Sequence, residues 1–204
     1  MKHLGKIGLV RHGETFANLD KVWHGQTDTQ LTAKGYQQAK YLGEYFHHYM
    51  RPSVIYASPL QRARITAESI AAKFDLAVNL DPRLMEFDLG DWEGRTFESL
   101  RQSEDILGQL VSNPDFTAPG GESQNLVKKR VVAAIDEIVQ RHNEENIVFV
   151  AHGVTIGIAI SHYLNNDTTC WPQYGKKNTA FSELCLNTNK LISFNKTDHL
   201  GQDQ

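Results

Sequence analysis

Short runs of Val, Ile and Leu alternate along the chain with longer segments in which apolar residues recur every three or four positions. The short runs predict buried strands and the longer segments predict amphipathic helices, an alternation typical of a layered α/β domain. We therefore predict a three-layer αβα sandwich around a mostly parallel, mixed sheet. The predicted strands are 6–10, 53–57, 77–80 and 147–151, with 182–187 and 191–195 as a closing pair around Asn187-Thr188-Asn189.

Polar residues that favour helix starts precede two of the helical segments. A Thr or Ser side chain in this position accepts a hydrogen bond from the first turn of the helix. The two predicted caps are Thr32, before an apolar stripe of Ala39, Leu42, Phe46 and Tyr49, and Ser123, before a stripe of Val127, Val131, Ala134 and Ile138.

The segment 86–122 differs from the rest of the chain. It holds nine acidic residues against only Arg95 and Arg101, with Gly, Pro and Trp scattered through it. We interpret it as an excursion from the sheet that forms a small cap or insertion. No composition shift marks a second independent unit, so residues 1–204 are expected to form a single domain.

Composition narrows the class of protein. The chain has 40% hydrophobic and 22% charged residues and a formal net charge of −3, which does not favour nucleic acid. Its one basic triplet, Lys128-Lys129-Arg130, is interpreted as the solvated face of a helix. No apolar stretch is long enough to span a membrane or to form a signal peptide, so we expect no membrane partner and a cytoplasmic location. Cys170 and Cys185, the only cysteines, are expected to be reduced structural thiols.

Two predicted strands end in the same dipeptide, His-Gly. His12 and Gly13 follow the first strand, and His152 and Gly153 follow the strand 147–151. Ligands of open α/β sheets bind outside the carboxyl ends of the strands, so the two histidines would meet there if their strands are neighbours. Glycine lets the backbone turn sharply and approach a ligand, and the free N–H groups of a following helix favour an anion.

A third strand end adds an arginine to the same edge. After 53–57, Ser58 is predicted as an N-cap with Pro59 as the first helical residue, which places Arg62 in the opening turns. The helix macrodipole disfavours a cation there unless an anionic partner lies beside it. Together with Arg11 and the two imidazoles, Arg62 would form a pocket for a tetrahedral dianion such as phosphate.

Five motifs in order carry a resemblance to a known family. They are RHGET at 11–15 with Asn18 following, GQTDTQLTAKG at 25–35 with Gln26, SPLQRARITA at 58–67, EFDLGDWEG at 86–94 and AHG at 151–153. The sequence resembles the histidine phosphatase superfamily, which includes the phosphoglycerate mutases, and within it the phosphatase branch. The resemblance covers most of the chain and implies a phosphoglycerate mutase-like fold.

The resemblance also implies roles for particular residues. His12 would attack phosphorus and carry it as a phosphohistidine, and Glu86 would protonate the leaving group and then activate water. Neither a cofactor nor a metal is implied, because cationic side chains neutralise the phosphoryl group. The residues that would hold its oxygens are Arg11, Arg62 and His152, and those that would contact the substrate are Asn18, Gln26 and Gly153.

Three functions stay open on the sequence. The first is a metal-independent phosphomonoesterase that hydrolyses a small phosphorylated metabolite, the second a cofactor-dependent phosphoglycerate mutase, and the third a catalytically inactive phosphate-binding module. Phe87 and Asp88 stand where mutases carry basic and aromatic residues, and Val154 stands where they carry a polar amide. The acidic segment 86–122 would also repel a phosphoglycerate. The phosphatase is therefore preferred, and its oligomeric state is left open, a homodimer being one option.

Overall fold

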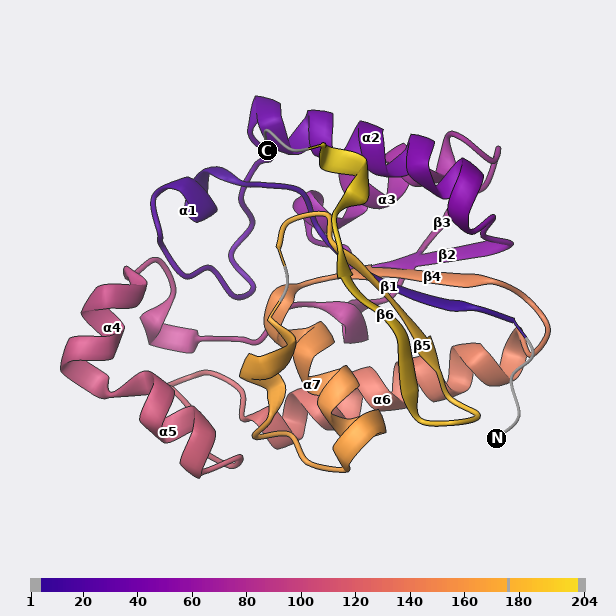
Figure 1. The fold of residues 1–204 in the computed structure, drawn as a ribbon. Coiled ribbons are helices and arrows are strands. Elements are labelled where there is room, and N and C mark those ends of the chain that lie inside the picture. Colours follow the sequence, from indigo (N-terminus) through magenta and orange to yellow (C-terminus); the bar gives the residue numbers. More distant parts are fainter. Residues whose placement is uncertain (1–4, 176, 202–204) are drawn as a thin grey trace.

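Six strands form one mixed sheet in the order β3-β2-β4-β1-β5-β6 (Figure 1). The computed structural model describes residues 5–175 and 177–201. The four parallel strands are β1 (Ile7–Arg11), β2 (Val54–Ala57), β3 (Val78–Leu80) and β4 (Ile147–Ala151). A hairpin of β5 (Phe181–Cys185) and β6 (Lys190–Lys196) closes one edge and pairs antiparallel with β1. The predicted mostly parallel, mixed sheet is confirmed.

Alternation along the strands divides the core between two faces of the sheet. In β4, Ile147 and Phe149 pack on one face, and Val148 and Val150 pack on the other. Helices α6 (Gln124–Arg141) and α7 (Gly153–Asn165) cover the first face, and α2 (Ala33–Tyr49) and α3 (Gln61–Ala71) cover the second (Figure 1). This arrangement confirms the three-layer αβα sandwich.

Both predicted caps at the long helices are present. The Thr32 hydroxyl accepts the Gly35 N–H at 2.9 Å, and the Ser123 hydroxyl accepts the Leu126 N–H at 3.3 Å. Each bond satisfies a backbone donor that has no partner within its own helix. The stripes that follow these caps pack against the two faces of the sheet, as their spacing predicts.

The predicted cap at Ser58 is wrong. Helix α3 begins at Gln61, with Leu60 in the N-cap position and no side-chain cap from that residue. The Ser58 N–H still donates to the Val150 carbonyl of β4 at 3.0 Å, so this residue is held by the sheet rather than by the helix. The carboxylate of Asp28 accepts the Gln61 N–H instead, at 3.0 and 3.1 Å.

The segment 86–122 forms a separate lobe at one end of the sheet (Figure 1). It contains the short helices α4 (Phe97–Glu104) and α5 (Ile106–Ser112), and a backbone bridge between Val22 and Thr96 joins it to the segment that follows α1 (Phe16–Leu19). An apolar cluster of this lobe, with Phe87, Leu89 and Leu100 among its members, packs on Val127 of α6 and Ile158 of α7. The lobe is therefore anchored to the helices that follow it in the sequence.

Single 3₁₀ turns complete the described chain. They are η1 (Pro82–Leu84), η2 (Gly90–Trp92), η3 (Trp171–Tyr174) and η4 (Asp198–Leu200). None of the helices in the described ranges combines the length and the apolar character needed to cross a membrane.

Candidate active site

The two His-Gly strand ends lie side by side. Strands β1 and β4 are hydrogen-bonded neighbours, with Arg11 in register with Ala151. His12 and His152 follow directly, and their ring centroids are 5.2 Å apart at an interplanar angle of 55°. Both side chains are buried, with 4% and 0% of their surface exposed. The structure thus brings together the two histidines that the sequence places at separate strand ends.

The His12 ring has one nitrogen bound and the other available. Its Nδ1 lies 2.7 Å from the Gly13 carbonyl oxygen, which can only accept, so Nδ1 carries the hydrogen and Nε2 carries the lone pair. Burial lowers the pKa of His12 well below its ordinary 6.5, and the Arg62 and Arg11 cations lower this pKa further. His12 is therefore neutral at neutral pH, with Nε2 able to act as a nucleophile.

The His152 ring is tied by the opposite nitrogen. Its Nε2 lies 2.8 Å from the Ser58 hydroxyl, whereas its buried Nδ1 has no hydrogen-bond partner among the described residues. The Ser58 oxygen already accepts the Leu60 N–H at 3.3 Å, which leaves its hydrogen and one lone pair to meet Nε2. We assign the hydroxyl as the donor, which places the ring hydrogen of His152 on Nδ1. Burial first, and then Arg62, lower the pKa of His152 well below 6.5.

Arg62 is held rigidly although it is buried. Its guanidinium donates to the carbonyls of Gly25 at 2.6 Å and Thr27 at 3.0 Å, and it lies 3.8 Å from the Asp28 carboxylate. Asp28 is thus an anionic partner of the kind that an arginine at a helix start requires. Burial lowers the pKa of Arg62, as it does that of Arg11, and Glu86 opposes this effect at both.

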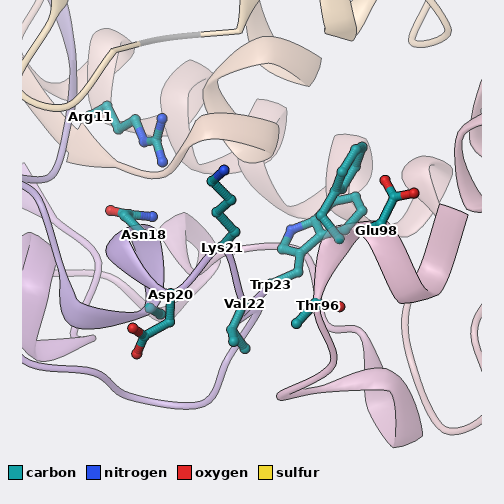
Figure 2. Close-up of a pocket in the computed structure, with 10 residues that line it drawn as sticks. Arg11, Asn18, Asp20, Lys21, Val22, Trp23, Thr96 and Glu98 are labelled. Carbon is teal, nitrogen blue, oxygen red and sulfur yellow. The ribbon is translucent and has the colours of Figure 1, made fainter.

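Asn18 has its amide oriented by two donors. Its Oδ1 accepts the Thr15 N–H at 3.2 Å and the Asn178 amide at 3.0 Å. The Asn18 amino group is consequently left to point toward the space that the Arg11 guanidinium enters (Figure 2). The Asn178 amide also donates to the His12 carbonyl at 3.1 Å, so one side chain positions both residues.

The Glu86 side chain packs against the first turn of α7 and is 6% exposed. Its Oε1 accepts the Phe87 N–H, the Thr155 N–H and the Thr155 hydroxyl at 2.9 to 3.0 Å. Its Oε2 accepts the Val154 N–H at 3.1 Å and no other donor among the described residues. The free N–H groups that the sequence assigned to a substrate anion therefore hold Glu86, and Oε2 is the oxygen with capacity to exchange a proton.

Arg130 corrects the interpretation of the basic triplet as a solvated helix face. Its guanidinium donates to the Met85 carbonyl at 2.6 Å, to the Glu86 carbonyl at 2.9 Å and to both oxygens of Glu122 at 2.8 Å. Gln26 donates to the same Glu86 carbonyl at 3.2 Å and to Glu122 at 3.5 Å. Gln26, Glu122 and Arg130 thus support the backbone that carries Glu86.

The two glycines after the histidines have different reasons to be small. Neither has a left-handed backbone, so a sharp turn does not require them. A Cβ on Gly13 would lie 2.6 Å from the Gly35 carbonyl oxygen, a steric clash, so Gly13 permits close packing of two backbone segments. A Cβ on Gly153 would meet nothing closer than Arg11 Nε at 3.7 Å, an ordinary contact.

Five of the predicted site residues line a cavity of about 60 Å³, and His152 and Gln26 are not among its lining residues. This volume suits a group of phosphate size, and Trp23 and His24 complete its wall. Gly153 lines an adjoining space rather than this cavity. In the described part of the chain, no three His, Cys, Asp or Glu side chains gather as metal ligands would. The predicted site residues that line the cavity are Arg11, His12, Asn18, Arg62 and Glu86.

Sequence reasoning missed several residues that organise the site. Thr155 follows AHG by two positions and could have been found as part of that motif. Ser58 was singled out, but as a helix cap. Arg130 and Asn178 carry no local signal for these roles, because Arg130 reaches the Glu86 carbonyl across 44 positions and Asn178 reaches the His12 carbonyl across 166.

The fold and the site geometry agree with a comparison against family models. The chain belongs to the histidine phosphatase superfamily, branch 1, whose model matches residues 7–196. The matched range includes both histidines, both arginines and Glu86. Phosphatases occur among the proteins of similar structure, so family and neighbours together support phosphatase activity in the broad sense.

Particular relatives extend this comparison. The chain is 37% identical over 161 residues to a protein named "Probable phosphoglycerate mutase GpmB" from Salmonella paratyphi C, covering 78% of this chain and 74% of that protein. It is similar to a phosphoserine phosphatase from Entamoeba histolytica in complex with 3-phosphoglyceric acid, with 32% identity, a TM-score of 0.87 and coverage of 97% and 100%. A mycobacterial glucosyl-3-phosphoglycerate phosphatase in complex with VO₃ has 29% identity, a TM-score of 0.82 and coverage of 89% and 91%.

Proposed function

We propose that this protein is a metal-independent phosphomonoesterase that hydrolyses a small phosphorylated metabolite through a phosphohistidine on His12. The observation that carries this proposal is the pair of buried histidines tied by opposite ring nitrogens. His12 presents a lone pair on Nε2 at the wall of a cavity of phosphate size, and His152, whose ring centroid is 5.2 Å away, carries its hydrogen on Nδ1. The first pattern suits a nucleophile, and the second suits a donor to a phosphoryl oxygen.

The proposed reaction has two displacements. His12 Nε2 attacks phosphorus, a P–N bond forms, the P–O ester bond breaks, and Glu86 Oε2 gives its proton to the departing alkoxide. Water then attacks the phosphohistidine, its proton passes to Glu86, and the P–N bond breaks to release phosphate. Arg11, Arg62 and His152 would stabilise the equatorial oxygens, where charge is spread in the transition state.

A mutase is the second candidate, and the name of the Salmonella relative favours it. The residues that would have to receive a phosphoglycerate argue against it. Phe87 is 1% exposed and Val154 is 6% exposed, and both pack in the apolar cluster of the lobe rather than offering polar contacts.

The predicted repulsion by segment 86–122 is weaker than its residue count indicates. Several of its carboxylates are engaged within the protein: Glu122 pairs with Arg130, and Glu93 accepts N–H groups from residues 25–27. Charges that are paired at short range repel a distant anion less. The choice of a phosphatase therefore depends on the buried Phe87 and Val154 rather than on net charge.

The deciding experiment supplies 3-phosphoglycerate with a trace of 2,3-bisphosphoglycerate and measures both free phosphate and 2-phosphoglycerate. A phosphatase releases phosphate with little isomerisation, whereas isomerisation that greatly exceeds phosphate release would replace our proposal with the mutase. A parallel assay with a panel of small phosphoesters, with and without EDTA, tests the metal independence. Loss of activity on chelation would contradict that part of the proposal.

A further inference from the structure

The phosphate-sized cavity adjoins a larger compartment, with which it shares part of its wall. This compartment has a volume of about 730 Å³ and shares Arg11, Asn18 and Trp23 with the smaller cavity. Volumes of this size hold whole small-molecule ligands, whereas 60 Å³ holds only the phosphoryl group. The alcohol part of a substrate bound at His12 must therefore lie in the space outside the smaller cavity.

Two aromatic rings form one wall of the larger compartment. The ring centroids of Trp23 and Phe97 are 5.7 Å apart at an angle of 52°, and Phe97 is 38% exposed. The backbone fixes this wall, because the Phe97 N–H donates to the Lys21 carbonyl at 3.1 Å and the Trp23 N–H donates to the Arg95 carbonyl at 3.0 Å. A flat, apolar ligand group that packs on these two rings removes their exposed aromatic surface from water, which stabilises the bound state.

A lysine shares the compartment with these rings. Figure 2 shows the Lys21 side chain extending toward the Arg11 guanidinium, with the Trp23 indole beside it. No carboxylate among the described residues forms an ion pair with Lys21. The acids nearby are otherwise directed: Glu98 pairs with Arg101 at 3.0 Å, and the Asp20 carboxylate points away from the lysine in Figure 2. The ammonium group is therefore available to a negative charge on a ligand.

We propose that the preferred substrates are phosphomonoesters whose alcohol part carries a flat apolar ring and a second anionic group. The ring packs on Trp23 and Phe97, and the anion pairs with Lys21. This inference rests on the proposed phosphatase function and adds the class of leaving group. It assigns specificity to the loop after α1 and to the start of α4, which the backbone bridge between Val22 and Thr96 joins.

The test compares kcat/KM for glycerol 1-phosphate, benzyl phosphate and 4-carboxybenzyl phosphate. All three release an alkoxide, so they make similar demands on the proton donor. We expect the wild-type values to rise in that order, with at least tenfold between the first and the last. F97A should lower the values for both benzyl esters about five- to tenfold and change glycerol 1-phosphate less than twofold. K21M should lower only that of the carboxybenzyl ester.

Matched controls come from residues outside the compartment. F194A removes a phenyl ring of similar exposure, 41%, from β6, and K129M removes an exposed ammonium group from α6. Neither should change the order of the three substrates. Equal kcat/KM for the three esters, or an F97A variant that lowers all three equally, would overturn the inference while leaving the phosphatase function intact. Absence of phosphate release from every ester would overturn both.

Discussion

The ends of β1 and β4 use the same two residue types, histidine and glycine, for different purposes. Each strand ends beside a buried histidine followed by glycine, and the two rings lie among the same arginines. At β1 the histidine binds its own neighbour's carbonyl through Nδ1. At β4 the histidine binds Ser58, from the end of β2, through Nε2. The local contact leaves a lone pair on Nε2 of His12, which lines the cavity, and the contact across the sheet leaves the hydrogen of His152 on Nδ1.

The surroundings of the two strand ends differ as well. His152 is the N-cap of α7, a helix of 13 residues whose first N–H groups hold Glu86. His12 is followed by a loop and by the four-residue helix α1, which positions Asn18. The β1 end is therefore suited to attack on phosphorus, and the β4 end to binding oxygens and moving protons.

Replacing the histidine at β1 should have the largest effect. We expect H12N to lower kcat by on the order of 10⁴-fold or more, because the nucleophile itself is lost. H152N should cost less, on the order of 10²- to 10³-fold, because it removes one donor to the phosphoryl group. Quenching at neutral or alkaline pH with labelled substrate should reveal an acid-labile, base-stable adduct on residue 12. An adduct on His152 would reverse the assignment of the two strand ends.

The next effect concerns the proton donor held at the start of α7. E86Q should lower kcat for an alkyl phosphate by roughly 10²- to 10⁴-fold, the usual contribution of a general acid. An aryl phosphate, whose leaving group needs little protonation, should lose much less. The aryl ester serves as the internal control for folding and binding. Equal losses on both esters would assign Glu86 to positioning alone and would weaken the division of roles between the two strand ends.

The sequence predicted which side chains gather at the site, because its motifs lie at the ends of strands whose apolar runs mark them clearly. Parallel strands bring their carboxyl ends to one edge, so His12, Arg62 and His152 could be placed together without coordinates. The strand order of β1 beside β4 was the step that the sequence left open, and the structure supplies it.

The orientation of these side chains could not be predicted in the same way. Which nitrogen of His152 carries the hydrogen depends on Ser58, 94 residues away, and the local pattern of Ser-Pro before a helix predicted a cap instead. The basic triplet 128–130 predicted an exposed position for Arg130. The packing of the lobe on α6 instead places Glu86 within reach of its guanidinium. Contacts between distant segments decided both cases.

Removing the Ser58 hydroxyl should have a smaller effect than any change above. S58A takes away the partner of His152 Nε2 and lets hydrogen occupy either ring nitrogen, so we expect kcat/KM to fall about tenfold, consistent with one lost hydrogen bond. The ¹⁵N shifts of the His152 ring should move from the Nδ1–H pattern toward a mixture of tautomers, while those of His12 stay unchanged.

A buried serine outside the site provides the control for this change. Ser161 is also 0% exposed, and its hydroxyl donates to the Asp167 carbonyl near the far end of α7. S161A should lower stability without altering the His152 tautomer. If S58A leaves the ¹⁵N pattern of His152 as it is in the wild type, the serine does not set the orientation of the hydrogen and the contrast between the two rings needs another cause.

The smallest effect should appear in the pH dependence of stability, where the two rings behave alike. Burial lowers the pKa of both His12 and His152 in the folded protein, so below pH 6.5 the unfolded chain binds more protons than the folded chain. The free energy of unfolding should therefore fall as pH drops below about 6.5, by at most about 1.4 kcal/mol per pH unit for each histidine. Above about pH 7.5 neither ring should contribute.

Thermal unfolding between pH 7.5 and 5 should show a smaller loss of Tm for H12N and for H152N than for the wild type. H199Q is the matched variant outside the site, since burial lowers the pKa of His199 to about 4 and removing it should flatten the same window. If H12N flattens the pH dependence of Tm and H152N does not, the two histidines differ in proton affinity as well as in the nitrogen they present.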